Sequence, residues 1–169
     1  SGKSVFARHA AARLGPAPGA VILRTDEIRK RLVGADAHEP LAPGAYGPAV
    51  TRRTYDALFE LAGSILRAGR SVVLDATFLD AGPRVRAADL ARTLGVPLQG
   101  VWLEAPETVL TARVAGRRGD ASDATVETLR AQLAQDPGQM GGWTRLDASG
   151  PPEAVVETWA RVAQDRRPL

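Results

Sequence analysis

Ser1-Gly2-Lys3-Ser4 begins the chain and leads into Val5-Phe6-Ala7-Arg8, which has a helical pattern. The tetrapeptide matches the second half of the phosphate-binding loop G-x-x-x-x-G-K-[ST], whose last residues open a helix. In that loop the final glycine lets the backbone wrap the phosphates, the lysine reaches the outer phosphates, and the hydroxyl binds Mg²⁺. We therefore expect Ser1, Gly2, Lys3 and Ser4 to bind the phosphates of ATP, with Ser4 also a ligand of Mg²⁺.

The choice of basic residue supports this motif. Of the 22 Lys and Arg residues in the chain, only Lys3 and Lys30 are lysines. A lysine supplies a flexible point charge, which suits a phosphate cradle better than the planar fork of an arginine. A β-strand must aim such a loop at the nucleotide, and the sequence carries neither that strand nor the first glycine of the loop. We therefore expect a fragment of a longer chain that lacks its central strand, with an upstream fused domain as one option.

Composition narrows the class of protein. A chain of 169 residues suits a single domain spanning 1–169, and 44% hydrophobic with 24% charged residues is ordinary for a soluble globular protein. The absence of cysteine excludes a disulfide scaffold and thiolate chemistry, and it fits a cytoplasmic location. No apolar run is long enough to predict a membrane span. A net charge of +3 does not by itself indicate nucleic-acid binding, so no nucleic-acid partner is expected.

Short apolar runs alternate with longer helical patterns, which is typical of an α/β fold with a parallel sheet flanked by helices on both faces. The predicted strands are 21–23, 71–75, 98–104 and 143–146. The predicted helices are 4–14, 26–33 capped by Thr25, about 50–68, 83–94, one starting at Pro106, one capped by Ser122 or Asp123 and running to about Gln135, and 152–165. Residues 34–48 are predicted as a substrate-side loop and residues 116–123 as a small lid.

Asp75 ends the second apolar strand, in the pattern of three hydrophobic residues followed by Asp. Such a carboxylate can hold Mg²⁺ across from the phosphate-loop hydroxyl of Ser4. The alternative is an Asp that only begins a turn after the strand. The position of the strand, downstream of a phosphate-loop motif, favours the metal role.

Asp26 follows the first strand, at the carboxyl edge where open α/β sheets bind their ligands. A carboxylate there can accept a proton from a substrate hydroxyl during phosphoryl transfer. The alternative is that Asp26 and Glu27 only offset the dipole of the helix they begin. The two roles are compatible, and we predict Asp26 as a catalytic and substrate-binding residue.

Arg113 and Arg117 are four residues apart, so they share a face of a continuing helix. They flank Gly116 at the start of the predicted lid, which suits guanidinium groups delivered onto a transferring phosphate. We predict both as catalytic and ATP-binding, the alternative being a solvated helix end. Arg29 and Arg84 are predicted to grip the substrate or else to be surface charges, and Thr77 is placed with them on the substrate side.

Four stretches together resemble the small P-loop kinases of the nucleoside-monophosphate-kinase type. The resemblance is greatest to a group of predicted kinases, AAA-family ATP-binding proteins that occur alone or behind an aminoglycoside-phosphotransferase-like domain, and it extends to gluconate kinase, chloramphenicol phosphotransferase and zeta toxins. The stretches are Ser1–Ser4, Arg24–Leu32, Val73–Leu79 and Asp120–Ala124. The resemblance implies a P-loop NTPase fold and use of ATP and Mg²⁺. It also implies Asp26 as the base, Asp75 at the metal and Arg113 with Arg117 as the lid clamp.

The leading hypothesis is an ATP- and Mg²⁺-dependent kinase that phosphorylates a hydroxyl of a small polar molecule, of the sugar, antibiotic or nucleotide-sugar type. One alternative is a polynucleotide 5′-hydroxyl kinase, which needs stacking aromatics that a 5% aromatic content hardly supplies. The other is a non-catalytic nucleotide-sensing module of a larger protein.

Overall fold

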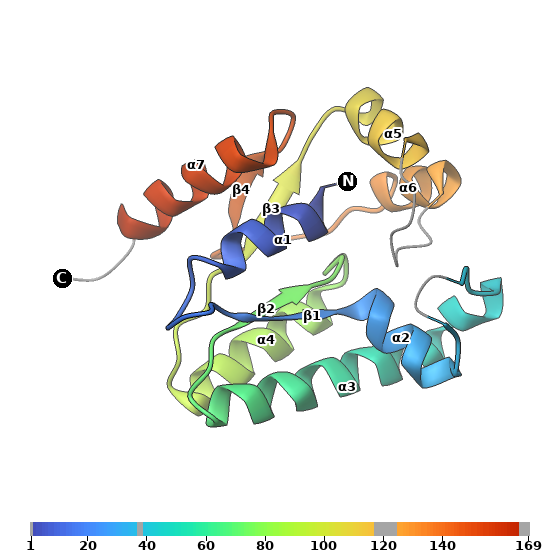
Figure 1. The fold of residues 1–169 in the computed structure, drawn as a ribbon. Helices are drawn as coiled ribbons and strands as arrows, with labels where there is room; N and C mark the ends of the chain where they lie inside the picture. The colour runs from blue at the N-terminus through green and yellow to red at the C-terminus, as the bar shows by residue number, and fades with distance from the viewer. Residues whose placement is uncertain (1, 37–38, 117–124, 166–169) are drawn as a thin grey trace.

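The computed structural model describes residues 2–36, 39–116 and 125–165, and it has the predicted architecture of parallel strands flanked by helices (Figure 1). In chain order the elements are α1 (Lys3–Ala11), β1 (Val21–Arg24), α2 (Thr25–Val33), the 3₁₀ helix η1 (Pro43–Tyr46), α3 (Pro48–Arg67), β2 (Val72–Asp75), α4 (Ala81–Leu94), β3 (Val101–Glu104), α5 (Glu107–Ala115), α6 (Val126–Leu133), β4 (Thr144–Asp147) and α7 (Pro152–Asp165). Within the described ranges, each helix is too short or too polar to span a bilayer.

The strands form two parallel pairs. β1 pairs with β2 from Val21 opposite Val72 to Arg24 opposite Asp75. β3 pairs with β4 up to Glu104 opposite Asp147. Because parallel strands end at the same edge, this register brings the side chains that follow β1 and β2 to one place.

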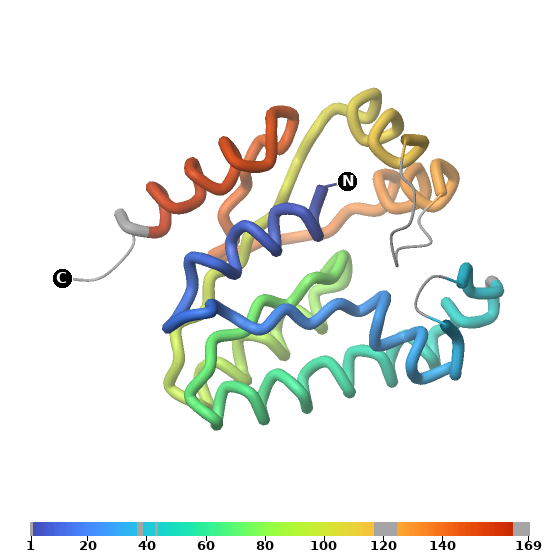
Figure 2. The backbone as a smooth tube through the Cα atoms, viewed as in Figure 1, coloured from blue at the N-terminus to red at the C-terminus, as the bar shows by residue number. Residues whose placement is uncertain are grey.

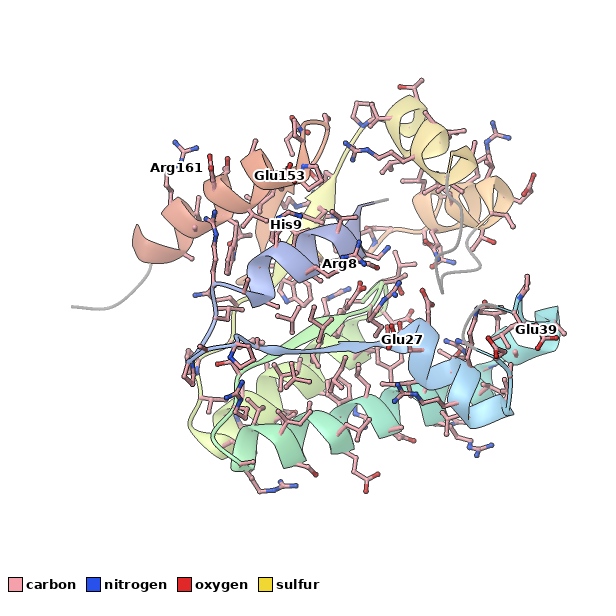
Figure 3. The ribbon with its side chains drawn as sticks, viewed as in Figure 1. Arg8, His9, Glu27, Glu39, Glu153 and Arg161 are labelled. Carbon is pink, nitrogen blue, oxygen red and sulfur yellow. The ribbon has the colours of Figure 1, made fainter. Side chains whose placement is uncertain are left out.

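Helices cover both faces of the β1–β2 pair. α3 and α4 lie on one face, where Leu58 and Phe59 of α3 pack with Ala87 of α4 in a buried cluster. α1 lies on the other face and also packs against α7 (Figure 2). The buried side of α1 consists of alanines, Ala10 among them, so the helix can approach its neighbours closely. α1 and α7 also approach each other at His9 and Glu153, whose side chains are 3.6 Å apart (Figure 3).

A largely apolar cavity of about 560 Å³ separates β2 from β3. Residues 71–79 line one side and residues 96–103 another, and Lys3 and Phe6 of α1 also face it. In the part of the chain that the structure describes, no backbone hydrogen bond joins β2 to β3. The described strands therefore form two separate parallel pairs, with this cavity between them.

Two predicted helix caps are wrong. Thr25 is the first residue of α2 rather than its cap, and its Oγ1 donates a hydrogen bond of 3.4 Å to the carbonyl oxygen of Asp75. Ser122 and Asp123 lie outside the described residues, and the cap of α6 is Thr125, which accepts a hydrogen bond of 3.2 Å from the backbone N–H of Thr128. Before α6 the sequence offers Ser122, Asp123 and Thr125, all residue types that cap helices, so the pattern alone does not single out Thr125.

Several element boundaries differ from the prediction, such as the end of α1 at Ala11 rather than at residue 14, and two further differences follow. The third strand begins at Val101 rather than at residue 98, because its partner β4 begins at Thr144, opposite Val101. The substrate-side loop 34–48 contains the short helix η1. Neither change moves a predicted site residue away from its edge of the fold.

Candidate active site

The amino-terminal end of α1 has the geometry of an anion-binding turn. Gly2 precedes the helix with φ 92° and ψ −8°, a left-handed conformation that glycine adopts without the strain a side chain would add. Its carbonyl oxygen accepts the first helical hydrogen bond, 3.0 Å from the backbone N of Phe6. Lys3 and Ser4 thus occupy the first turn, where free N–H groups and the helix dipole favour an anion. Ser1 lies outside the described residues.

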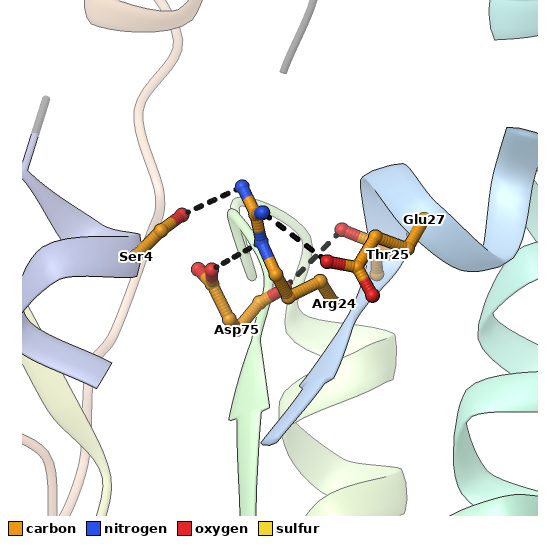
Figure 4. Close-up of polar contacts among 5 residues, drawn as sticks. All are labelled: Ser4, Arg24, Thr25, Glu27 and Asp75. Carbon is orange, nitrogen blue, oxygen red and sulfur yellow. Dashed lines mark hydrogen bonds and ion pairs between the residues drawn. The ribbon is translucent and has the colours of Figure 1, made fainter. Parts of the chain in front are cut away.

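Arg24, at the end of β1, connects this turn to β2 (Figure 4). Its Nη2 donates a hydrogen bond of 3.1 Å to Oγ of Ser4, and its Nε is 3.3 Å from Oδ2 of Asp75. Its Nη1 donates a hydrogen bond of 3.2 Å to Oε1 of Glu27, in the first turn of α2. One guanidinium group therefore contacts the hydroxyl and the carboxylate that the sequence predicts as magnesium ligands.

The donor atoms of Ser4 and Asp75 suit a magnesium ion. Mg²⁺ is a hard cation that takes oxygen ligands, commonly one or two carboxylates together with phosphate oxygens and water. Both side chains already face one cationic group, so the same space can hold a cation. Among the described residues no group of three or more His, Cys, Asp and Glu is arranged to hold a metal, so the remaining ligands of Mg²⁺ would come from phosphate and water.

Other predicted residues gather around this point. Lys3, Asp75 and Thr77 line the same cavity, so the predicted phosphate-binding lysine lies on the same space as the predicted metal carboxylate. Asp26 is half-buried in the first turn of α2, two residues beyond Arg24. The start of α1 and the carboxyl end of β2 therefore bring together predicted phosphate and metal residues, while Asp26 follows β1 at the same edge of the strand pair and its role stays a prediction.

Arg113, on α5, lies beside the phosphate turn but is engaged by backbone. Its guanidinium donates hydrogen bonds of 2.5, 2.9 and 3.1 Å to the carbonyl oxygens of Ala148, Ser149 and Gly150, in the segment between β4 and α7. Its Nη1 is 3.6 Å from the position that a Cβ on Gly2 would take. Arg113 thus anchors the β4–α7 segment next to the turn. Arg117 lies outside the described residues, so the predicted pairing of the two arginines stays a prediction.

Arg29, on α2, is buried, so the alternative that it is a surface charge is wrong. It donates hydrogen bonds of 2.9 Å to the carbonyl oxygen of Ala45 and 3.2 Å to Oγ1 of Thr51, and it lies 5.0 Å from the ring centroid of Tyr46. These contacts tie η1 to α2 and α3. Arg29 therefore holds the substrate-side loop against α2 and α3.

Arg84, on α4, is also buried, and the surface-charge alternative is wrong for it too. It donates hydrogen bonds to the carbonyl oxygens of Phe78, Leu79 and Pro137 at 2.6, 2.8 and 2.5 Å. Phe78 has φ 49°, an uncommon value for a residue with a side chain. Arg84 holds the segment that follows Asp75 in this conformation.

Sequence reasoning missed two contributors to the site. Tyr55, on α3, is almost fully buried, and this burial raises the pKa of its phenol, although hydrogen bonds with the Thr77 side chain and the Phe78 backbone offset part of the rise. Arg24 was also missed. Its signal is a basic residue at the end of a strand, directly before the acidic first turn of a helix.

Comparison with known proteins supports the fold. A gluconokinase from Sinorhizobium meliloti 1021 superimposes with a TM-score of 0.61 at 24% identity, covering 97% of this chain and 88% of that one. A sugar kinase from Janibacter sp. HTCC2649 gives 0.60 at 22% identity, covering 98% and 92%, and the tunicamycin resistance protein of Deinococcus radiodurans gives 0.61 at 15%, covering 97% and 90%. The chain therefore has the fold of the small P-loop kinases.

The family follows from the sequence comparison. A family model described as an AAA domain matches residues 1–136, and the chain belongs to that family. An uncharacterized protein of Mycobacterium tuberculosis H37Rv is 34% identical over 164 residues, and a protein of Mycobacterium bovis matches equally well. The match covers 92% of this chain and 31% of each relative, so the chain spans less than a third of the length of these proteins.

Proposed function

We propose that this domain is an ATP- and Mg²⁺-dependent kinase that transfers the γ-phosphoryl group to a hydroxyl of a small polar molecule, of the sugar, antibiotic or nucleotide-sugar type. The observation that carries the proposal is the meeting of Ser4 and Asp75 at one cation-holding point beside the first turn of α1. A hydroxyl and a carboxylate in this relation are oxygen donors of the kind that would hold a magnesium ion.

The residues around this point divide into three roles. The backbone at Gly2 and the amine of Lys3 bind the phosphates, and Arg113 with Arg117 adds positive charge to the transferring group. Asp26, at the carboxyl edge of β1, orients the acceptor hydroxyl and takes its proton. Ser4 and Asp75 would hold Mg²⁺, which would neutralise charge on the phosphate oxygens.

The two buried arginines act indirectly in this proposal. Arg29 and Arg84 place the substrate-side loop and the segment after β2 through hydrogen bonds to backbone carbonyls. Thr77 follows Asp75 by two residues and lines the cavity, and we assign it a contact with the acceptor. Because the similar structures include a gluconokinase and a sugar kinase, sugars and sugar acids are the first acceptors to test.

The test is a phosphoryl-transfer screen with ATP and Mg²⁺ against sugars, sugar acids, aminoglycosides, nucleosides and 5′-hydroxyl oligonucleotides. Lys3→Ala should lower turnover by about 10²–10³-fold while leaving the fold intact, because one preorganised charge at the transferring group is lost. Arg8→Ala, an exposed residue on the same helix, is the matched control and should retain activity. Full activity in Lys3→Ala would contradict the proposal.

A non-catalytic nucleotide sensor is the second candidate, and one observation favours it. Arg113 is fully engaged by three carbonyl oxygens, as expected for a residue that transmits nucleotide binding to the β4–α7 segment rather than clamping a phosphate. Asp26→Asn separates the two functions. If Asp26→Asn loses phosphoryl transfer but still binds ATP, the kinase is supported. If both wild type and Asp26→Asn bind ATP and neither transfers phosphate, the sensor is supported.

A further inference from the structure

Arg24 occupies a place that the proposed kinase needs for another cation. Its guanidinium faces three partners: Nη2 and Nη1 donate hydrogen bonds to Ser4 and Glu27, and Nε makes no hydrogen bond but lies 3.3 Å from Oδ2 of Asp75 (Figure 4). The side chain is 13% exposed, and that of Asp75 is 6% exposed. Because Arg24 and Asp75 are opposite each other in the β1–β2 register, the sheet itself delivers the cation to the carboxylate.

A carboxylate as buried as Asp75 requires a positive partner. Removing such a group from water costs several kcal/mol unless a nearby cation and hydrogen bonds compensate. Arg24 supplies that charge in the nucleotide-free protein. It also donates to Ser4, whose hydroxyl is thereby directed to the same point.

Arg24 and Mg²⁺ cannot hold these two side chains together. Mg²⁺ requires its oxygen ligands at about 2.0–2.1 Å in near-octahedral geometry, with lone pairs turned to the metal. The Ser4 oxygen accepts an N–H of Arg24 at 3.1 Å, and two neighbouring cations would also repel each other. We propose that Arg24 is a displaceable placeholder for Mg²⁺, and that the two cations compete for Ser4 and Asp75. This inference rests on the proposed function, since it takes Ser4 and Asp75 as the metal ligands.

Glu27 can remain paired with the Arg24 guanidinium after Arg24 leaves Asp75. It lies in the first turn of α2, it is 37% exposed, and it already accepts a hydrogen bond from Nη1 of Arg24. Arg24 can therefore leave Asp75 by turning about this outer contact, without becoming an unpaired charge. The charge of Asp75 is balanced by Arg24 before the exchange and by the metal after it, while Arg24 stays paired with Glu27. Neither state therefore leaves a buried charge without a partner.

The test compares wild type with Arg24→Gln by two readouts that do not depend on turnover. The first is the unfolding equilibrium with and without saturating Mg²⁺·ADP, and the second is the Mg²⁺ concentration that half-saturates ADP binding. Without nucleotide, Arg24→Gln should raise the unfolding constant about tenfold, because Asp75 loses its cation. With Mg²⁺·ADP the difference should disappear, since the metal then compensates the charge of Asp75 in both proteins.

Thermodynamic linkage ties the readouts together. The half-saturating Mg²⁺ concentration should fall in Arg24→Gln by the same factor, about tenfold, by which the nucleotide-free protein is destabilised. Arg24→Lys keeps a competing cation, so its half-saturating Mg²⁺ concentration should stay within about threefold of the wild-type value. This variant also keeps the test possible if Arg24→Gln does not fold. Arg145→Gln breaks the exposed ion pair with Glu104 and should leave the Mg²⁺ requirement unchanged.

The outcomes separate the two proposals. If wild type binds Mg²⁺·ADP but Arg24→Gln needs as much or more Mg²⁺, or Arg24→Lys needs about tenfold less, Arg24 is not a competitor and this inference is overturned alone. If wild type shows no Mg²⁺-dependent nucleotide binding, the metal site and the inference both fail. A matched tenfold shift in both readouts supports the placeholder.

Discussion

Arg84 donates a hydrogen bond of 2.6 Å to the carbonyl oxygen of Phe78, which among the described residues is the non-glycine position with a positive φ. The bond joins α4 to the turn that follows Asp75, directly beside the proposed metal site. A buried cation thus holds an uncommon backbone conformation, as expected where a binding site stores local strain.

Replacing Arg84 with Met should destabilise the fold strongly. The carbonyl oxygens of Phe78, Leu79 and Pro137 would lose a charged donor, and we expect a cost of about 3 kcal/mol in the free energy of unfolding. Urea unfolding measures it. Arg92→Met on the same helix removes an exposed ion pair with Asp89 and should cost no more than about 0.5 kcal/mol. Equal costs would contradict the role given to Arg84.

Gly2→Ala should impair nucleotide binding through the backbone rather than through a clash. A Cβ at Gly2 would meet Arg113 at 3.6 Å, an ordinary contact, but φ 92° is unfavourable for alanine. We expect a stability cost of about 1 kcal/mol and at least about tenfold weaker ATP binding, as the turn leaves its phosphate-binding shape.

The matched control is Gly34→Ala. Gly34 ends α2 with φ 72° and has open space around its missing Cβ. Alanine there should cost a similar amount of stability and leave ATP affinity unchanged, as measured by calorimetry. If both variants weaken ATP binding equally, the effect is one of stability and the role of Gly2 in the phosphate turn is refuted.

Arg113→Met should loosen the segment between β4 and α7. Three backbone carbonyls lose their donor, so amide hydrogen exchange in residues 147–151 should speed up by about tenfold or more, corresponding to about 1.4 kcal/mol. Exchange in the β1–β2 pair should not change. Unaltered exchange at 147–151 would mean that the segment does not depend on Arg113.

Tyr55→Phe should change how stability depends on pH at the alkaline end. Burial raises the pKa of Tyr55 from its ordinary value of 10.0, so the unfolded chain loses this proton at a lower pH than the folded protein. Tyr55 thus contributes stability that is fully present below about pH 10 and is lost as pH rises through the higher folded value.

The variant should be less stable than wild type by about 1 kcal/mol near neutral pH, because the hydrogen bond with Thr77 is gone. The difference should shrink above pH 10. Chemical denaturation at a series of pH values measures both effects. Tyr46→Phe, which changes the other tyrosine of the chain at an exposed position, should follow the wild-type pH profile. A constant difference between Tyr55→Phe and wild type would refute the role of burial.

Sequence patterns were sufficient for the fold because its elements are locally encoded. The apolar run ending in Asp75 predicts β2, and the stop at Gly69 places the end of α3 within two residues of its observed bound, Arg67. The P-loop kinase fold and the family are confirmed by the comparisons. The start of α2 at Thr25 and the cap of α6 at Thr125 were not predictable, since Ser, Thr and Asp side chains near a helix start are all acceptable caps.

The site was predictable only in part because its contacts are distant in sequence. Arg24 reaches Ser4 across 20 positions and Asp75 across the strand register, and neither relation leaves a local pattern. Arg29 and Arg84 show a second reason why the site was only partly predictable. An arginine that binds substrate and one that binds buried carbonyls look alike in a sequence, since both need only a long stem and a donor fork.

The chain has only two lysines, which makes selective chemical labelling of its phosphate turn possible. Lys30 is only 2% exposed, whereas Lys3 faces the cavity at the phosphate turn. Of the two lysines, the half-buried Lys3 is therefore the more exposed to an acylating reagent, in a protein otherwise rich in arginine. Mass spectrometry of the Lys3 adduct would report whether the site is occupied. In a longer form of the polypeptide, peptide mapping would separate this adduct from those of other lysines.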